Sequence, residues 1–191
     1  MFLEKSDTRE DLIKELKERN ERWMGFDHNY GDYNNSLNTI ILTCVDSRVP
    51  VEKIFNLKPG EVLVIRNAGN LIDQESMRSI LLGIFEIHVK YVIIMGHTRC
   101  GCSIRDNKEI VDELMGIIPQ ELKNELNLTT EEDILDWFGL FNQNQWDQNI
   151  MNNCSVLKKN LSAILDPGIN PEIIPAIYDL DLKKVIFLEE K

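Results

Sequence analysis

Three short apolar segments constrain the fold of this chain more than any other feature. Thr39–Cys44, Val62–Arg66 and Tyr91–Gly96 are rich in β-branched residues and almost continuously hydrophobic. Such runs are typical of strands that are buried on both faces of a parallel sheet. A helical pattern capped by Asp73 separates the second run from the third. Strand, helix and strand in this order predict an α/β fold with right-handed crossovers.

The rest of the chain supplies the other elements of one expected domain, residues 1–191, whose residues 1–24 form a helical amino-terminal arm. No internal repeat or linker interrupts it. Before the first strand we predict an amphipathic helix over 7–23 and a loop over 25–38. After the third strand the chain is predicted to be mainly helical from Gly101 to about Leu165, with breaks near 116–119 and 139–146. A turn over 166–171 and strands at Ile173–Tyr178 and Lys184–Leu188 complete the prediction.

Composition excludes several classes of function. The formal net charge is −11, which argues against nucleic acid, since phosphate binding requires clusters of Lys and Arg. The most apolar stretch, Ile80 to Met95, is interrupted by charged residues and does not read as a membrane span. With no visible signal peptide, we expect a cytoplasmic protein whose four cysteines are free thiols or metal ligands.

The predicted strands end in residues that can bind a metal ion. Cys44 ends the first strand, and His97 and Cys100 follow the third. Because the carboxyl ends of parallel strands meet at one edge of a sheet, these side chains are expected to lie together. Two thiolates and one imidazole suit zinc, and three protein ligands leave a fourth position for water. The pattern predicts one catalytic zinc ion per chain.

Asp46 and Arg48 are the predicted catalytic partners of this ion. Two thiolates cancel the charge of zinc, so its bound water needs a further group that stabilises hydroxide. Asp46 can accept a hydrogen bond from that water, and Arg48 can hold the Asp46 carboxylate in place. A plain ion pair at a turn is the alternative interpretation.

At these residues the sequence resembles the β-class carbonic anhydrases, most closely their small archaeal-type members. The resemblance rests on Cys44-x-Asp46-x-Arg48, Arg66-Asn-Ala-Gly69 and His97-x-x-Cys100-Gly, in that order. It implies four parallel strands with an antiparallel edge strand, flanked by helices, and a homodimer or higher homo-oligomer. It also implies reversible hydration of carbon dioxide to bicarbonate by zinc-bound hydroxide.

Two alternative functions remain open. Residues 131–138 resemble a segment of the carbon disulfide hydrolases, and Arg99 stands where carbonyl sulfide hydrolases can also have Arg. Cys102 replaces the Met or Gly that is usual in the family. The first alternative is therefore a hydrolase of carbon disulfide or carbonyl sulfide. The second is a zinc scaffold or thiol sensor without turnover.

Several other residues receive structural interpretations. Arg66 and Asn67 are expected to tie loops together or contact a dimer partner, and Gly69 to form a tight turn. His88, expected on the helix before the third strand, and His28, expected in a loop, are minor candidates for proton transfer. The residues interpreted as packing or interface residues are Cys102, Cys154, Trp137 and Phe138.

Overall fold

The computed structural model describes residues 9–22, 35–139 and 141–189, which fall into two units, 1–32 and 33–191. Helix α1 (Arg9–Glu21) is the described element of the first unit. It confirms a helix within residues 7–23, and its Leu12 and Leu16 are exposed. Residues 7, 8 and 23 of the predicted helix, and residues 25–34 of the predicted loop, lie outside the described residues. The prediction of a single domain stays a prediction.

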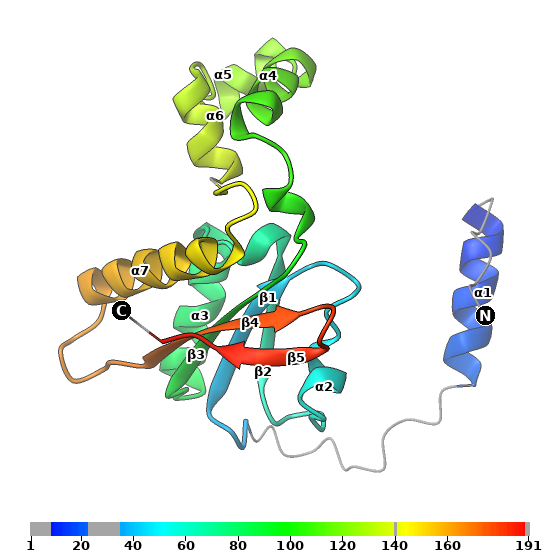
Figure 1. Ribbon diagram of the computed structural model, residues 1–191, viewed down its shortest axis with the longest axis vertical. Helices are drawn as coiled ribbons and strands as arrows, with labels where there is room; N and C mark the ends of the chain where they lie inside the picture. The colour runs from blue at the N-terminus through cyan, green and yellow to red at the C-terminus, as the bar shows by residue number, and fades with distance from the viewer. Residues whose placement is uncertain (1–8, 23–34, 140, 190–191) are drawn as a thin grey trace. The chain divides into compact units, whose positions relative to one another are not determined.

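A five-stranded sheet forms the centre of the second unit (Figure 1). The first four strands in the spatial order are parallel, and the last is antiparallel to its neighbour. This arrangement confirms the predicted fold class. The spatial order is β2 (Leu63–Asn67), β1 (Thr39–Cys44), β3 (Tyr91–His97), β4 (Glu172–Asp179) and β5 (Lys184–Phe187).

Both faces of the sheet are covered, which explains the unbroken apolar runs. On one face, Ile40 and Ile94 pack in a core that includes residues of α3 (Gln74–Glu86) and α7 (Trp146–Ile164). On the other face, Ile41 and Met95 pack near the short helix α2 (Val51–Ile54) and the loop after it. Successive residues of a strand point to opposite faces, so the central strands β1 and β3 are apolar at most positions on both faces.

The region after Cys100 contains more separate helices than the sequence predicts. It contains α4 (Asn107–Ile117), α5 (Gln120–Glu125) and α6 (Glu131–Phe138), ahead of α7. A break not foreseen by sequence separates α5 from α6, where Asn127 has a φ of 57° and Thr130 caps α6. Val111, Leu128 and Ile134 form a small core of their own there.

One expected position is wrong. Helix α3 ends at Glu86, so His88 does not lie on it. His88 has a φ of 58°, a left-handed conformation that a continuing helix cannot contain. The longer helix was predicted because His88 continues the three- and four-residue spacing of the helix, but the helix is capped at Ile87, one residue before it.

Candidate metal centre

The candidate ligands gather at the carboxyl edge of the sheet. Cys44 is the last residue of β1 and His97 the last of β3. These strands are parallel neighbours, with Thr43 opposite Met95. Cys100 follows three residues after His97 and precedes the 3-10 turn η2 (Gly101–Ser103). The side chains of Cys44, His97 and Cys100 are all buried.

Three sulfur atoms lie together at this edge. The Sγ atoms of Cys44 and Cys100 are 3.9 Å apart. Among the described residues, Cys102 joins them, because all three sulfurs lie within 4.8 Å of one another. Hydrogen bonds from Cys100 and Cys102 hold the pKa of Cys44 far below its usual range. Interactions with Cys100 and Cys44, together with burial, raise the pKa of Cys102. Sequence analysis treated Cys102 as a packing residue; the Cys-Gly-Cys spacing is the signal that could have found it.

His97 presents one ring nitrogen without a partner. Its Nδ1 lies 2.9 Å from the carbonyl oxygen of Thr98, so Nδ1 is the atom that donates a proton there. Its Nε2 is buried and has no hydrogen-bond partner among the described residues. Burial lowers the pKa of His97, but the neighbouring thiol groups of Cys100 and Cys44, which favour the charged imidazolium, outweigh burial and raise the pKa to about 10. The hydrogen bond to the backbone thus leaves Nε2 as the ring nitrogen that is available to a metal ion.

Asp46 and Arg48 form a close, bidentate ion pair. Arg48 Nη2 lies 2.6 Å from Oδ2 of Asp46, and Nε lies 2.9 Å from Oδ1. The Arg48 backbone N–H also donates to Oδ1. Hydrogen bonding to Arg48 lowers the pKa of Asp46 to about 2, so this carboxyl is ionised at neutral pH. Oδ2 of Asp46 is 3.8 Å from Nε2 of His97, which places the carboxylate beside the candidate ligands.

Arg66 holds the loop that contains the ion pair. Its guanidinium donates to the carbonyl oxygens of Cys44, Asp46 and Val49, at 3.2, 2.9 and 2.8 Å. This contact agrees with the loop-tying interpretation of Arg66. Asn67 has the same kind of role, because its side chain bonds both the N–H and the carbonyl of Leu71.

Gly69 allows the turn η1 (Ala68–Asn70) to pack closely against Phe141. Its φ is 73°, which L side chains rarely adopt, and a Cβ there would overlap the ring of Phe141. The tight turn expected at Gly69 is confirmed.

The donor set fits a zinc ion. Two sulfurs bound to one tetrahedral zinc are about 3.8 Å apart, given Zn–S bonds of about 2.3 Å. The 3.9 Å between the Cys44 and Cys100 sulfurs matches that separation. The unpartnered Nε2 of His97 supplies the imidazole nitrogen that zinc accepts. A buried nitrogen without a hydrogen-bond partner lowers the stability of the folded protein, and a metal ion bound to Nε2 would remove this penalty.

A small cavity lies next to these ligands. Its volume is about 10 Å³, and His97 and Cys100 contribute to its lining. Asn70 and Trp146 line it too, and Nδ2 of the first and Nε1 of the second are buried without a hydrogen-bond partner among the described residues. The cavity has space for about one water-sized molecule. Sequence analysis did not identify either residue, since neither carries a motif of its own.

The Arg99 side chain turns to another part of the surface. Its Nη2 lies 2.9 Å from Oδ1 of Asp181, in the turn between β4 and β5. Both side chains are largely exposed. The contact of Arg99 with the centre is through its carbonyl oxygen, which accepts a hydrogen bond from Arg48.

Other candidates lie outside the cluster. Cys154 is buried in the core on α7, as expected for a packing residue. Trp137 and Phe138 are exposed at the end of α6, so they do not pack in a helix core. His28 lies outside the described residues.

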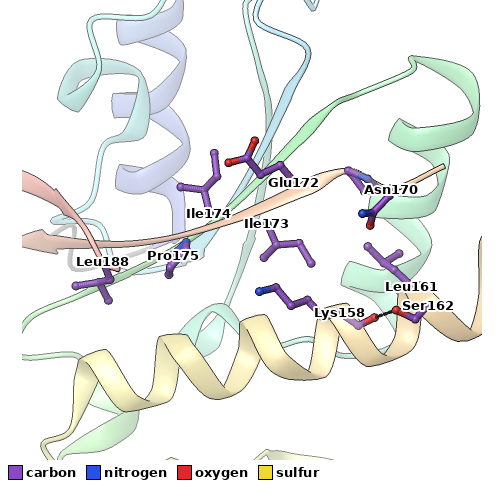
Figure 2. A pocket seen from close by; sticks show the side chains of 10 residues that line it. Lys158, Leu161, Ser162, Asn170, Glu172, Ile173, Ile174, Pro175 and Leu188 are labelled. Carbon is purple, nitrogen blue, oxygen red and sulfur yellow. Dashed lines mark hydrogen bonds between the residues drawn. The ribbon is translucent and has the colours of Figure 1, made fainter. Parts of the chain in front are cut away.

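A larger cavity exists but contains none of the predicted site residues. It has a volume of about 520 Å³ and lies between α7 and the beginning of β4. Figure 2 shows Lys158, Leu161 and Ser162 of α7 facing Glu172 to Pro175. β4 begins at Glu172, whereas Tyr178 near its other end pairs with His97. This cavity is therefore at the opposite end of the strand from the candidate ligands.

Comparison with known proteins assigns the chain to a family. The family profile described as carbonic anhydrase matches residues 39–183. The chain belongs to the β-class carbonic anhydrase family. Membership in this family confirms the resemblance of its three motifs.

The relatives are named for two different enzyme activities. A carbon disulfide hydrolase from Saccharolobus solfataricus is 30% identical over 63% of this chain and 64% of its own length. Carbonic anhydrase 2 from Mycobacterium tuberculosis is 35% identical over 46% of this chain and 47% of its own length. The matches thus span about half to two thirds of these relatives.

A solved structure agrees with the fold. A carbonic anhydrase from Streptococcus mutans superposes with a TM-score of 0.70 at 21% identity, covering 97% of this chain and 100% of the other. In the part of the chain that the structure describes, no helix has both the length and the apolar character needed to cross a bilayer.

Proposed function

We propose that this chain catalyses the reversible hydration of carbon dioxide to bicarbonate, with one zinc ion held by Cys44, His97 and Cys100. The observation that carries the proposal is the buried, unpartnered Nε2 of His97 beside a pair of thiols at zinc-binding separation. When bound there, zinc supplies a Lewis acid that lowers the pKa of water and so makes hydroxide available near neutral pH.

Asp46 is the residue that orients the attacking water. Its carboxylate, 3.8 Å from Nε2 of His97, is close enough to accept a hydrogen bond from water at the fourth position. An acceptor there orients the attacking oxygen toward the carbon of the substrate. Since the pKa of Asp46 is about 2, it remains an acceptor throughout the neutral range.

Arg48 and Arg66 are positioning residues. Arg48 binds both oxygens of Asp46, which leaves the carboxylate little freedom to move onto the ion. Arg66 donates to the carbonyl oxygens of Cys44 and Val49, on either side of Asp46, and to that of Asp46 itself. Together they maintain the angle at which Asp46 faces the ligands.

The cavity next to His97 favours an oxygen-containing substrate. Within the described residues, the buried N–H groups of Asn70 and Trp146 have no acceptor, and both residues line the cavity. An oxygen of carbon dioxide or bicarbonate is a better acceptor for these donors than the sulfur of carbon disulfide. This difference is the reason for choosing carbon dioxide over the sulfur substrates.

The sulfur substrates remain the second candidate, because a carbon disulfide hydrolase is among the relatives at 30% identity. The purified protein loaded with zinc should be assayed on carbon dioxide, carbon disulfide and carbonyl sulfide under the same conditions. We expect the highest kcat/KM for carbon dioxide. Turnover of a sulfur substrate with negligible hydration of carbon dioxide would overturn the proposal.

Assembly and location are part of the same proposal. The β-class resemblance leads us to propose a homodimer or a larger homo-oligomer in the cytoplasm, without nucleic acid or membrane as a partner. Light scattering of the full chain measures the oligomeric state. A monomer at micromolar concentration that hydrates carbon dioxide would contradict the assembly alone.

A further inference from the structure

The third thiol of the cluster has no role in the proposed reaction. Cys102 lies in η2, two residues after Cys100, and is partly exposed. Its sulfur is nevertheless within 4.8 Å of the sulfurs of both Cys44 and Cys100. Cysteine sulfurs at such distances can form a disulfide or can bind a common metal ion. Cys44, Cys100 and Cys102 are not joined to one another by a disulfide.

The distances suit a common ion. Sulfurs on one tetrahedral zinc are about 3.8 Å apart. Cys44 and Cys100 already have that separation, at 3.9 Å. Since the Cys102 sulfur lies within 4.8 Å of both, a movement of at most about 1 Å relative to each would bring it to that separation. A rotation within the three-residue turn η2 is enough for such a shift.

Asp46 is the other side chain near the fourth position, but it is already engaged. Arg48 donates to both of its oxygens through the side chain and to Oδ1 through the backbone. To bind the ion, Asp46 would have to give up some of these charge-assisted bonds. A thiolate is also a softer ligand and is well suited to zinc. Cys102 is therefore the stronger competitor for the fourth position.

We propose that Cys102 is an exchangeable fourth ligand, which closes the centre as a site of three sulfurs and one imidazole. The proposal rests on the proposed function in one respect, namely that Cys44, His97 and Cys100 hold the ion. A site with four protein ligands is typical of structural zinc. The closed state therefore excludes substrate, and the open state, without Cys102, is the one that can turn over.

The test counts sulfur atoms around the ion in the full chain. The parent protein, Cys102→Ala and Cys102→Ser are loaded with zinc, and sulfur ligands are measured by X-ray absorption at the zinc edge. Cobalt(II) loading gives a second readout, since the thiolate-to-cobalt absorption grows with the number of thiolates. Cys154→Ala is the matched control, because it removes a buried thiol outside the cluster.

We expect the parent to show more than two sulfurs per ion, and both Cys102 variants to fall to two with weaker cobalt absorption. Cys154→Ala should match the parent. The serine variant covers the case in which alanine at this half-buried site prevents folding. Two sulfurs in the parent, unchanged by either substitution, would overturn the proposal.

The same samples separate this proposal from the proposed function. If Cys102→Ala loses one sulfur and hydrates carbon dioxide, both stand. If it loses one sulfur but neither it nor the parent has any turnover, the ligand assignment stands and the centre is a zinc scaffold. If Cys44→Ser binds zinc as tightly as the parent, the ligand set is wrong and both fail.

Discussion

Nε2 of His97 lies 3.8 Å from Oδ2 of Asp46, and the backbone determines which nitrogen faces the carboxylate. The carbonyl oxygen of Thr98 accepts a hydrogen bond from the Nδ1–H group, so Nε2 is the unprotonated acceptor nitrogen in the neutral ring. Two acceptors facing each other at this distance are unfavourable unless something positive lies between them. A proton on His97 satisfies this condition in the metal-free protein, in which its pKa is about 10. A divalent cation satisfies it in the loaded protein.

Metal binding should therefore release protons and strengthen with rising pH. At pH 7, below the His97 pKa of about 10, the metal-free imidazole carries a proton that zinc must displace. We expect zinc affinity to increase between pH 6 and 9, with proton release that calorimetry in buffers of different ionisation enthalpy can count. A pH-independent affinity would contradict this assignment of His97.

Asp46→Asn should keep the metal and lose activity. The amide has nearly the shape of the carboxylate but lacks its charge, so it orients water less well. We expect about one zinc per chain and a fall in kcat/KM of about 10- to 100-fold. Metal analysis and stopped-flow hydration measure the two quantities. Asp181→Asn is the control, because this exposed carboxylate pairs with Arg99 instead. Full activity in Asp46→Asn would rule out the orienting role.

Arg48→Gln should raise the pKa of Asp46. In the parent, bonding to Arg48 lowers it to about 2, so the charged carboxylate is favoured in the folded state. The stabilisation is present above the ordinary Asp pKa of about 3.9 and is lost as the pH falls through about 2. In the variant, carbon NMR of the carboxyl should show a midpoint closer to 3.9. An unchanged midpoint would mean that another group stabilises the charge.

Gly69→Ala should destabilise the fold near the centre. An alanine at position 69 would have to adopt the left-handed φ of this glycine, which L residues rarely adopt, and its Cβ would overlap the ring of Phe141. We expect a loss of about 1–3 kcal/mol in the free energy of unfolding, from urea titration at fixed metal concentration. Gly168→Ala is the control, since nothing lies within 4 Å of its added Cβ. Equal stabilities for the two variants would argue against a constraint at Gly69.

Trp146→Phe tests the choice of substrate. It keeps an aromatic ring beside the cavity but removes the unpartnered N–H. If that N–H meets a substrate oxygen, kcat/KM for carbon dioxide should fall by a few-fold, as expected for the loss of one neutral hydrogen bond of about 1 kcal/mol. Any activity on carbon disulfide should change less. Equal effects on both substrates would leave the ring, and not its N–H, as the contributing group.

Much of the architecture was readable in the sequence because local physics produces it. Strands buried on both faces are apolar at most positions, so Thr39–Cys44 and Tyr91–His97 stand out from their surroundings. Their parallel order then brings the chain after Cys44 and the chain after His97 to one edge. The candidate ligands could be proposed from these two facts, and their role as ligands stays a prediction.

Contacts between distant segments were not readable, because no local pattern encodes them. The sulfur of Cys102 reaches Cys44 only through the curvature of the turn after β3. The cavity donors Asn70 and Trp146 are 76 positions apart in the numbering. The free nitrogen of His97 follows from one backbone carbonyl at the end of a strand. Periodicity and strand-end chemistry were sufficient for the fold and the donor types, whereas the packing of separate loops sets which donors face the same point in space.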